Sequence, residues 1–449
     1  MKDNTEIFSK IPVKKAVILL IIPTIISQLI TVVYNMADTF FIGQLNDPRQ
    51  VAAATVVLPA FIFLTGIANL FGIGGSSLIA RQLGMDERKK AVHTSAFSIW
   101  TALTVTVIYC LIMLIFSKSI LPMLGADSDT SSYCFDYLLW VVVIGGIPTV
   151  MNTMLSHLVR AEGYSKQAST GVAIGGILNI ILDPIFISVL GLELKGAAIT
   201  TMLSNVCATI YFLIFIRSKK DTTVITFNPK KYTVKYNIPK DVVIIGLSSF
   251  IINLMAIISN IILNNFIASY STVAIAGIGI AKKVDFLVIA IANGLTQGVL
   301  PLIAFNYASG DRKRMLDSIK TTLLYSMIIS VSGTLFLFFG AANVTGMFIN
   351  DADTIAYGKV FLRILSLSGP FLCINFLVVT IFQATGEKTR SLVLSMFRKG
   401  IIDIPFMLFF HINKNVIGIG WSTPIADFIS FVAAICFFVP YWKKLNKKS

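Results

Sequence analysis

Long apolar segments separated by short polar ones dominate the pattern along the chain. The apolar segments cover residues 15–43, 52–80, 91–117, 133–157, 168–190, 195–217, 240–269, 273–305, 318–341, 356–383, 391–411 and 415–438. Each is long enough to cross a hydrocarbon core of about 30 Å. Unbroken apolar runs favour helices over the alternating strands of a membrane barrel. The pattern predicts an all-α polytopic membrane protein with twelve transmembrane helices.

The composition supports this class and excludes others. Of the 449 residues, 55% are hydrophobic and only 13% are charged. Soluble domains carry about 25% charged residues. A soluble enzyme, a disordered chain and a nucleic-acid-binding domain are therefore excluded, and no nucleic acid partner is expected. The five cysteines form no CxxC pair, so neither a disulfide framework nor a zinc site is indicated.

The net charge of +15 follows the order of the spans. The two tails and the even-numbered gaps hold 27 of the 37 basic residues, and the odd-numbered gaps hold four, namely Arg49, Lys118, Lys195 and Lys414. Basic loops stay on the cytoplasmic side. The first 15 residues are polar, and the first span is longer than a signal h-region, so no cleaved signal is expected. We expect a multi-pass membrane protein with both termini cytoplasmic.

The second half of the chain repeats the first at an offset of about 221–226 residues. Gly84-Met85-Asp86-Glu87-Arg88-Lys89 is echoed by Gly310-Asp311-Arg312-Lys313-Arg314. Further matches are Pro148 with Pro370, Pro184 with Pro405, and Gly196 with Gly418. Each half holds six spans and returns to its starting side, so the halves share one orientation. We expect two six-helix bundles related by a pseudo-twofold along the membrane normal, a plan used by alternating-access transporters.

These repeats predict the domain boundaries. We expect a cytoplasmic tail at 1–14, an N-lobe at 15–217, a cytoplasmic basic linker at 218–239, a C-lobe at 240–438 and a basic tail at 439–449.

Ionisable side chains inside apolar spans are costly and need an explanation. Span 1 holds Asp38, span 5 holds Asn179 and Asp183 on one helix face, and span 6 holds Thr201. At 1.5 Å per residue, Asp183 and Thr201 lie at similar depths in the outer half of the membrane. A kink at Pro23 would draw Asp38 towards them.

Two carboxylates, an amide and a hydroxyl suit a hard monovalent cation, a proton, or both in competition. Two carboxylates in a low-dielectric medium can retain one proton near neutral pH. The alternative is a buried hydrogen-bond network that only locks span 1 to spans 5 and 6. We favour the ion site because neither carboxylate has a basic partner nearby in the sequence.

The second half differs in its charges. The counterparts of Asp38 are Leu263 and Asn264, and neither can titrate. Its charged residues form local pairs, Lys282 with Asp285 and Lys399 with Asp403, at helical spacings of three and four. Such pairs are more often structural than catalytic, and we interpret them in this way.

The chain resembles the MATE (multidrug and toxic compound extrusion) transporters in several features. These are the spans, the parallel repeat, and the segments Asn35-Met36-Ala37-Asp38 and Asn179-Ile180-Ile181-Leu182-Asp183-Pro184. The likeness covers almost the whole chain and is greatest for the DinF-like branch with its MepA-like bacterial drug exporters. It implies a cation site on Asp38, Asn179, Asp183 and Thr201, and a span-1 bend at Pro23. The NorM-like branch carries acidic residues in spans 7 and 10, where this chain has Asn260, Asn264 and Asn375.

The resemblance implies export of amphipathic, often cationic, organic compounds by a monomer in exchange for H⁺ or Na⁺, with no cofactor. Its partners would be drug-like substrates and membrane lipids, and the resemblance implies a place in the bacterial cytoplasmic membrane. A flippase for a lipid-linked precursor is the main alternative, but a pyrophosphate would favour a strongly cationic cavity, and the embedded cations here are few and mostly paired. An intramembrane enzyme would need a cluster of His, Asp or Ser, and the sequence has none.

Overall fold

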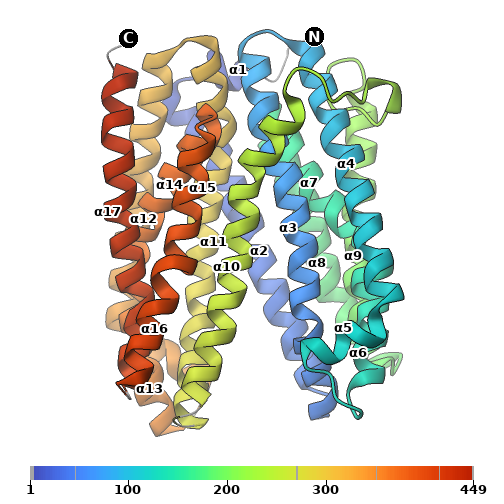
Figure 1. The fold of residues 1–449 in the computed structure, drawn as a ribbon, viewed down its shortest axis with the longest axis vertical. Helices are drawn as coiled ribbons and strands as arrows, with labels where there is room; N and C mark the ends of the chain where they lie inside the picture. The colour runs from blue at the N-terminus through green and yellow to red at the C-terminus, as the bar shows by residue number, and fades with distance from the viewer. Residues whose placement is uncertain are drawn as a thin grey trace. The chain divides into compact units, whose positions relative to one another are not determined.

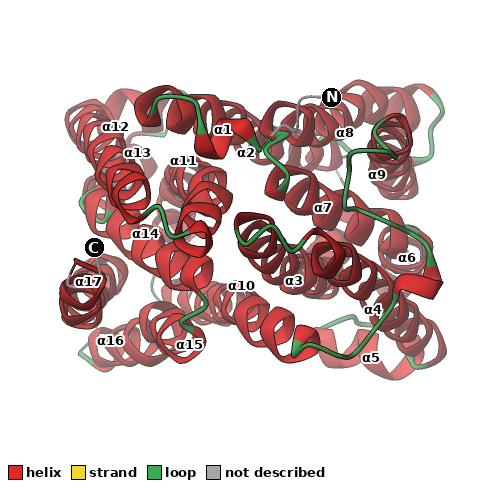
Figure 2. Ribbon diagram, turned by 90° about the horizontal axis from the view of Figure 1, so that it is seen from above, coloured by secondary structure: helices red, strands yellow, loops and turns green. Residues whose placement is uncertain are grey.

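The computed structural model describes residues 5–45, 47–268, 270, 272–349, 351–413 and 415–446. Throughout these residues the regular structure is helical, without a strand, as Figure 2 shows. Four lysines that contribute to the predicted charge pattern lie outside them, namely Lys2, Lys414, Lys447 and Lys448.

The first half of the chain contains six membrane-length segments and several short helices (Figure 1). The elements are α1 (Glu6–Ser9), α2 (Val13–Gly43), α3 (Pro48–Gly84), α4 (Arg88–Ile115), α5 (Ser117–Leu124), α6 (Ser131–Leu138), η1 (Leu139–Ile144), α7 (Gly146–Ala161), α8 (Ser165–Pro184), η2 (Ile185–Val189), α9 (Glu193–Ser218) and η3 (Pro229–Lys231).

The second half repeats this order. Its elements are α10 (Ile238–Ala268), α11 (Thr272–Ser309), α12 (Arg312–Gly346), α13 (Ala352–Ser366), α14 (Gly369–Thr385), α15 (Lys388–Met396), η4 (Phe397–Ile402), α16 (Asp403–Ile412) and α17 (Val416–Asn446).

Eleven segments of the described chain are long and apolar enough to span a membrane. Nine are single helices, and two are bent pairs, Ser131–Ile144 with Gly146–Ala161 at 46° and Ala352–Ser366 with Gly369–Thr385 at 41°. The remaining segment, 388–412, has similar length but contains Arg398, Lys399 and Asp403. The all-helical polytopic fold is confirmed, and twelve spans are consistent with it. The fourth and tenth spans are bent, however, which the unbroken apolar pattern did not predict.

Short polar turns separate the helices, and acidic residues cap several of them. Asp47 accepts a hydrogen bond from the Arg49 backbone at the start of α3, where Pro48 occupies the first helical position. Asp311 caps α12 in the same way. Such caps satisfy backbone N–H groups that have no partner within the helix.

The chain folds into two compact units. Unit 1 comprises residues 1–10 and 26–250, and unit 2 comprises residues 11–25 and 251–449. Two helices are therefore divided: the first part of α2 belongs to unit 2, and the first part of α10 belongs to unit 1. Pro23 lies inside α2, just before the division. Each unit thus contains part of a helix from the other half of the sequence.

Glycines allow these exchanged segments to pack closely. In unit 1, a methyl group on Gly246 of α10 would lie 1.8 Å from the Leu70 carbonyl oxygen of α3. In unit 2, a methyl group on Gly294 of α11 would lie 2.5 Å from Cα of Ile25 in α2. Both helix pairs approach at a distance that only glycine permits.

Candidate functional site

The polar side chains of unit 1 meet between α8 and α9. Asn179 Nδ2 donates to Asp183 Oδ1 at 3.2 Å and to Thr201 Oγ1 at 3.5 Å. Thr200 Oγ1 donates to the same Asp183 oxygen. All four residues are buried, and Asp183 is completely so. The structure therefore brings together three of the four residues named from the sequence.

The fourth residue, Asp38, lies on the part of α2 that belongs to unit 1. Its carboxylate interacts electrostatically with that of Asp183. In the described part of the chain, three buried acceptor atoms of this group have no hydrogen-bond partner: Asp38 Oδ1, Asn179 Oδ1 and Asp183 Oδ2. A buried oxygen without a donor costs free energy. Within the described chain, the cluster is thus short of hydrogen-bond donors.

The oxygen set defines the chemistry of this group. Carboxylate, amide and hydroxyl oxygens bind hard cations, and carboxylates also bind protons. No group of three or more His, Cys, Asp or Glu side chains that could hold a metal occurs in the described residues. The cluster, which we call the unit 1 acceptor cluster (Asp38, Asn179, Asp183, Thr200 and Thr201), fits H⁺ or Na⁺.

Sequence reasoning missed several of its neighbours. Thr200 donates to Asp183, and Asn205 Nδ2 donates to the Thr201 carbonyl oxygen at 2.9 Å. Asn152 of α7 in turn donates to Asn205 Oδ1 at 2.9 Å. Tyr137 interacts electrostatically with both carboxylates. Asn152 and Asn205 could have been noticed as amides in apolar spans, whereas the choice of Thr200 beside Thr201 depends on helix rotation.

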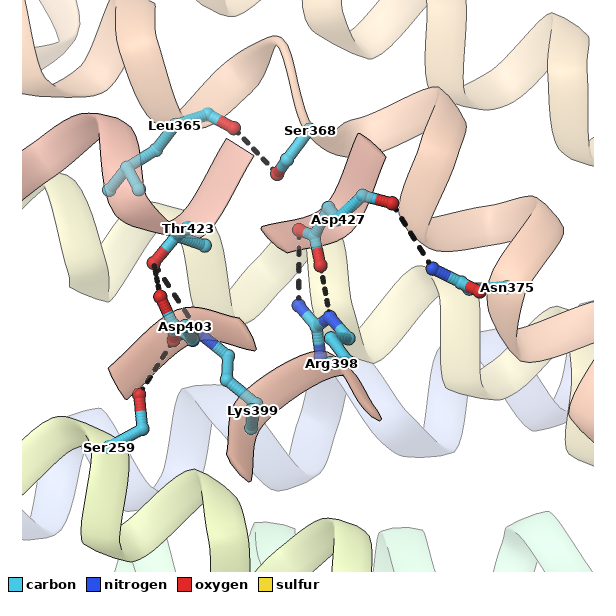
Figure 3. Close-up of polar contacts among 9 residues, drawn as sticks. All are labelled: Ser259, Leu365, Ser368, Asn375, Arg398, Lys399, Asp403, Thr423 and Asp427. Atoms are coloured by element: carbon cyan, nitrogen blue, oxygen red, sulfur yellow. Dashed lines mark hydrogen bonds and ion pairs between the residues drawn. The ribbon is translucent and has the colours of Figure 1, made fainter. Parts of the chain in front are cut away.

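Unit 2 contains a second buried polar group with a different balance (Figure 3). Lys399 Nζ lies 2.8 Å from Asp403 Oδ2, and Ser259 of α10 donates to the same oxygen at 2.7 Å. Thr423 of α17 lies 3.4 Å from both Asp403 Oδ1 and Lys399 Nζ. The Asp403 carboxylate therefore has a donor for each oxygen.

A second ion pair lies beside the first. The Arg398 guanidinium pairs with both carboxylate oxygens of Asp427 in α17, and both side chains are buried (Figure 3). The guanidinium also lies 5.4 Å from the Phe376 ring centroid. The arginine is thus placed between a carboxylate and a π face. Sequence reasoning missed this pair.

Local helix geometry explains the omission. Arg398 and Lys399 lie in η4, a π-helical segment, and both are buried. In a regular helix, neighbouring residues point about 100° apart. The wider turn lets two consecutive cations face the interior, as π-bulges often do at functional positions. We call Arg398, Lys399, Asp403 and Asp427 the unit 2 ion-pair cluster.

Lys282 and Asp285 lie on α11 near this cluster. They interact electrostatically with each other and with Arg398 and Lys399. Within the residues that the structure describes, however, they form no direct ion pair, in contrast to Lys399 and Asp403. The two side chains, which their spacing suggested as a pair, therefore interact electrostatically without a direct ion pair.

Comparisons with known proteins fit this arrangement. The model of the family described as MatE matches residues 23–185 and 245–409, which is one match in each half of the chain. The chain belongs to the MatE family. The resemblance that the sequence suggested is confirmed, and the two MatE matches correspond to the two halves of the internal repeat.

Curated relatives and solved structures agree with the MatE assignment. The multidrug export proteins MepA of Staphylococcus aureus strain MSSA476 and of Staphylococcus saprophyticus are each 31% identical over 436 residues, covering 97% of this chain and 96% of the relative. A crystal structure of MATE in complex with MaL6 has a TM-score of 0.93 and 23% identity, with all of both chains covered. An outward-facing multidrug resistance MATE family transporter of the MOP superfamily has a TM-score of 0.92 and 23% identity, covering 100% of this chain and 99% of that one. These structures establish the fold.

Proposed function

We propose that this protein is a secondary active multidrug efflux antiporter. It exports amphipathic, often cationic, organic compounds in exchange for H⁺ or Na⁺ by alternating access. Its MatE membership and its MepA relatives, named for multidrug export, support transport of drug-like compounds rather than enzymatic catalysis. It works as a monomer in the membrane and needs no cofactor beyond the coupling ion.

One observation carries the coupling part of the proposal. The unit 1 acceptor cluster has three buried acceptor atoms without a donor in the described chain, on Asp38, Asn179 and Asp183. A structural network would satisfy its buried atoms. A coupling site must instead keep some acceptor atoms free, so that a transported ion can bind to them and dissociate again. The deficit of donors therefore favours ion exchange over a purely structural role.

Four residues of the cluster have a role in this mechanism. Thr200 and Asn179 hold one oxygen of Asp183 and leave Oδ2 for the ion. Asp38 supplies a second carboxylate from α2, so ion binding would draw α2 towards α8 and relieve the repulsion between the two acids. Release of the ion would restore that repulsion. A carboxylate pair on two helices can thus convert ion occupancy into helix position.

Transport in proteoliposomes tests the proposal. Purified protein is reconstituted, a pH gradient or a sodium gradient is imposed, and the movement of a fluorescent lipophilic cation is followed. We expect gradient-dependent transport that stops when a protonophore or a sodium ionophore collapses the driving gradient. Transport unaffected by both ionophores would contradict ion coupling.

The orientation is a further part of the proposal. The excess of basic residues supports a cytoplasmic location for both termini and for residues 218–239. In a variant without native cysteines, a cysteine at Lys231 should resist an impermeant thiol reagent in intact cells. A cysteine at the exposed Ser128, in the turn between α5 and α6, should react and serve as the control. Strong labelling at position 231 would contradict the proposed orientation and place residues 218–239 outside the cell.

A further inference from the structure

The segment between α9 and α10 is not a loose connection. Residues 219–237, which we call the strap, belong to unit 1 and lie beside the start of α4, as the yellow-green segment at the top of Figure 1. Ser95 Oγ donates to the Val224 carbonyl oxygen at 2.7 Å, and the Thr226 backbone N–H donates back to Ser95 Oγ at 3.2 Å. Trp100 Nε1 donates to the Phe227 carbonyl oxygen at 3.2 Å.

Other contacts fix both ends of the strap. The Glu162 carboxylate, at the end of α7, accepts hydrogen bonds from Thr223 Oγ1 at 2.7 Å and from the Val224 backbone N–H. Further along, His93 Nδ1 lies 2.6 Å from the Lys231 carbonyl oxygen. The Tyr232 ring stacks on Phe97 with 5.7 Å between centroids. Side chains of α4 and α7 thus hold the strap backbone in place.

This anchoring leaves one face of the strap outward. Val224 and Ile225 are buried against unit 1. Beyond them the exposed residues include both cations and apolar or aromatic side chains, namely Lys230, Lys231, Tyr232, Val234, Lys235 and Tyr236. Val234 is 64% exposed and Tyr236 is 59% exposed. The structure therefore holds lysines and apolar groups together at the surface.

The charge and position of this face indicate its partner. The strap contains five lysines and one acidic residue, Asp221, which lies at its start, away from Lys230, Lys231 and Lys235 in the sequence. The strap lies at the helix ends of unit 1, next to Arg88 at the start of α4 and Glu162 at the end of α7. Lysine clusters beside membrane spans attract anionic lipids, and tyrosines favour the interface between head groups and acyl chains.

We propose that the strap is a docking surface for anionic phospholipid head groups. Lys230, Lys231 and Lys235 contact the phosphate-bearing head groups, while Val234 and Tyr236 enter the apolar edge of the same leaflet. Because the strap is pinned to α4 and α7, the site is preformed and needs no ordering of a flexible loop on binding. The proposal is independent of which ion drives transport and of which side of the membrane the strap faces.

Trp100 provides a local probe because its indole contacts the strap. In the full chain, Trp140, Trp421 and Trp442 are replaced by phenylalanine, and the protein is reconstituted in vesicles of phosphatidylcholine and phosphatidylglycerol. Quenching of Trp100 by brominated phosphatidylglycerol is compared with quenching by brominated phosphatidylcholine. We expect phosphatidylglycerol to associate at least about fivefold more strongly, the preference expected from one lysine near a membrane surface. Salt should reduce this preference.

Two triple variants decide whether the strap is responsible. Lys230→Gln, Lys231→Gln and Lys235→Gln together should bring the preference to about one, whereas the same three lysines changed to arginine should keep it. The matched control changes Lys313, Lys443 and Lys444, which are exposed residues of unit 2, to glutamine. The control should retain the preference. Equal quenching by both lipids in the unmodified strap, or an equal loss in the control, would overturn the proposal.

Discussion

The two buried polar groups, one in each unit, differ in how completely their acids are satisfied. In the unit 2 ion-pair cluster, Asp403 and Asp427 each face a cation on the adjacent π-helical turn. In the unit 1 acceptor cluster, Asp38 and Asp183 interact electrostatically, and the donors that the described chain gives Asp183 are the Thr200 hydroxyl and the Asn179 amide. A buried carboxylate that is paired with a cation of the protein does not readily bind a cation from solution, because displacing its partner would leave that partner buried without a counter-charge. A buried carboxylate without such a partner is suited to bind a mobile cation.

The same repeat thus supports two uses of buried carboxylates. In the mechanism that we propose, the protein supplies the positive charge in unit 2, so that group stabilises helix packing and stays fixed through transport. In unit 1 the positive charge comes from solution, so that group responds to ion concentration. Substitutions that alter the carboxylates or their donors in one cluster at a time test this comparison most directly.

The largest expected effect is the loss of ion coupling from unit 1. Asp38→Asn and Asp183→Asn should each abolish gradient-driven efflux, because either change removes one of the two carboxylates. The double variant should be no worse than either single one, since both empty the same site. The measurement is transport per folded molecule in proteoliposomes with an imposed pH or sodium gradient. Near-normal transport by either single variant would contradict coupling through unit 1.

The next effect is on stability, in unit 2. Asp403→Asn leaves Lys399 buried without its anion and should cost about 3–5 kcal/mol. The melting temperature or the expression level should fall, while the protein that does fold should keep its ion-driven transport. Lys399→Met combined with Asp403→Leu should recover much of the stability. If Asp403→Asn melts normally but loses all response to the gradient, then unit 2 carries the coupling.

A matched pair of hydroxyl variants compares the clusters more finely. Thr200 donates to Asp183 in unit 1, and Ser259 donates to Asp403 in unit 2. A hydrogen bond to a charged group contributes about 1.5–3 kcal/mol. Thr200→Val should change the concentration of coupling ion required for half-maximal transport by about tenfold or more. Ser259→Ala should lower thermal stability and leave that concentration unchanged. The same phenotype in both variants would remove the distinction.

The smallest effect is expected at Thr423. Its hydroxyl lies 3.4 Å from both Asp403 Oδ1 and Lys399 Nζ, at the long limit of a hydrogen bond. Thr423→Val should therefore cost about 1 kcal/mol or less, because the ion pair itself remains. Thermal unfolding compared with Ser259→Ala measures the difference. A loss at Thr423 as large as at Ser259 would show that the ion pair depends on the whole group.

The fold could be predicted from the sequence because the bilayer restricts the choices. Apolar runs long enough to span the membrane allow only helices, and the repeat at a nearly constant offset gives two sets of six. The bends at Gly145 and near Ser368 were not predictable from hydropathy, because both halves of a broken span remain apolar. Nor does hydropathy indicate that residues 11–25 pack with unit 2.

The candidate site was predictable in part for a similar reason. Asp38, Asn179 and Asp183 are conspicuous because polar groups are rare in apolar spans, and helical spacing aligns the last two. Which threonine donates to Asp183, in this case Thr200, depends on the rotation of α9. The burial of Arg398 depends on a π turn, which the residue pattern did not predict. Sequence thus indicates which groups are unusual, while their partners depend on tertiary geometry.

The division of α2 and α10 between the units has a consequence for biosynthesis. Unit 1 can be completed once the chain has been made as far as Phe250, but residues 11–25 emerge first and find their partners in residues 251–449, which emerge last. The opening half-helix must therefore wait in the bilayer at least until α11, whose Gly294 and Gly298 pack against it, has been made. A gene cut between its two repeats would encode two fragments, neither of which contains a whole unit, so only their co-expression could assemble the protein.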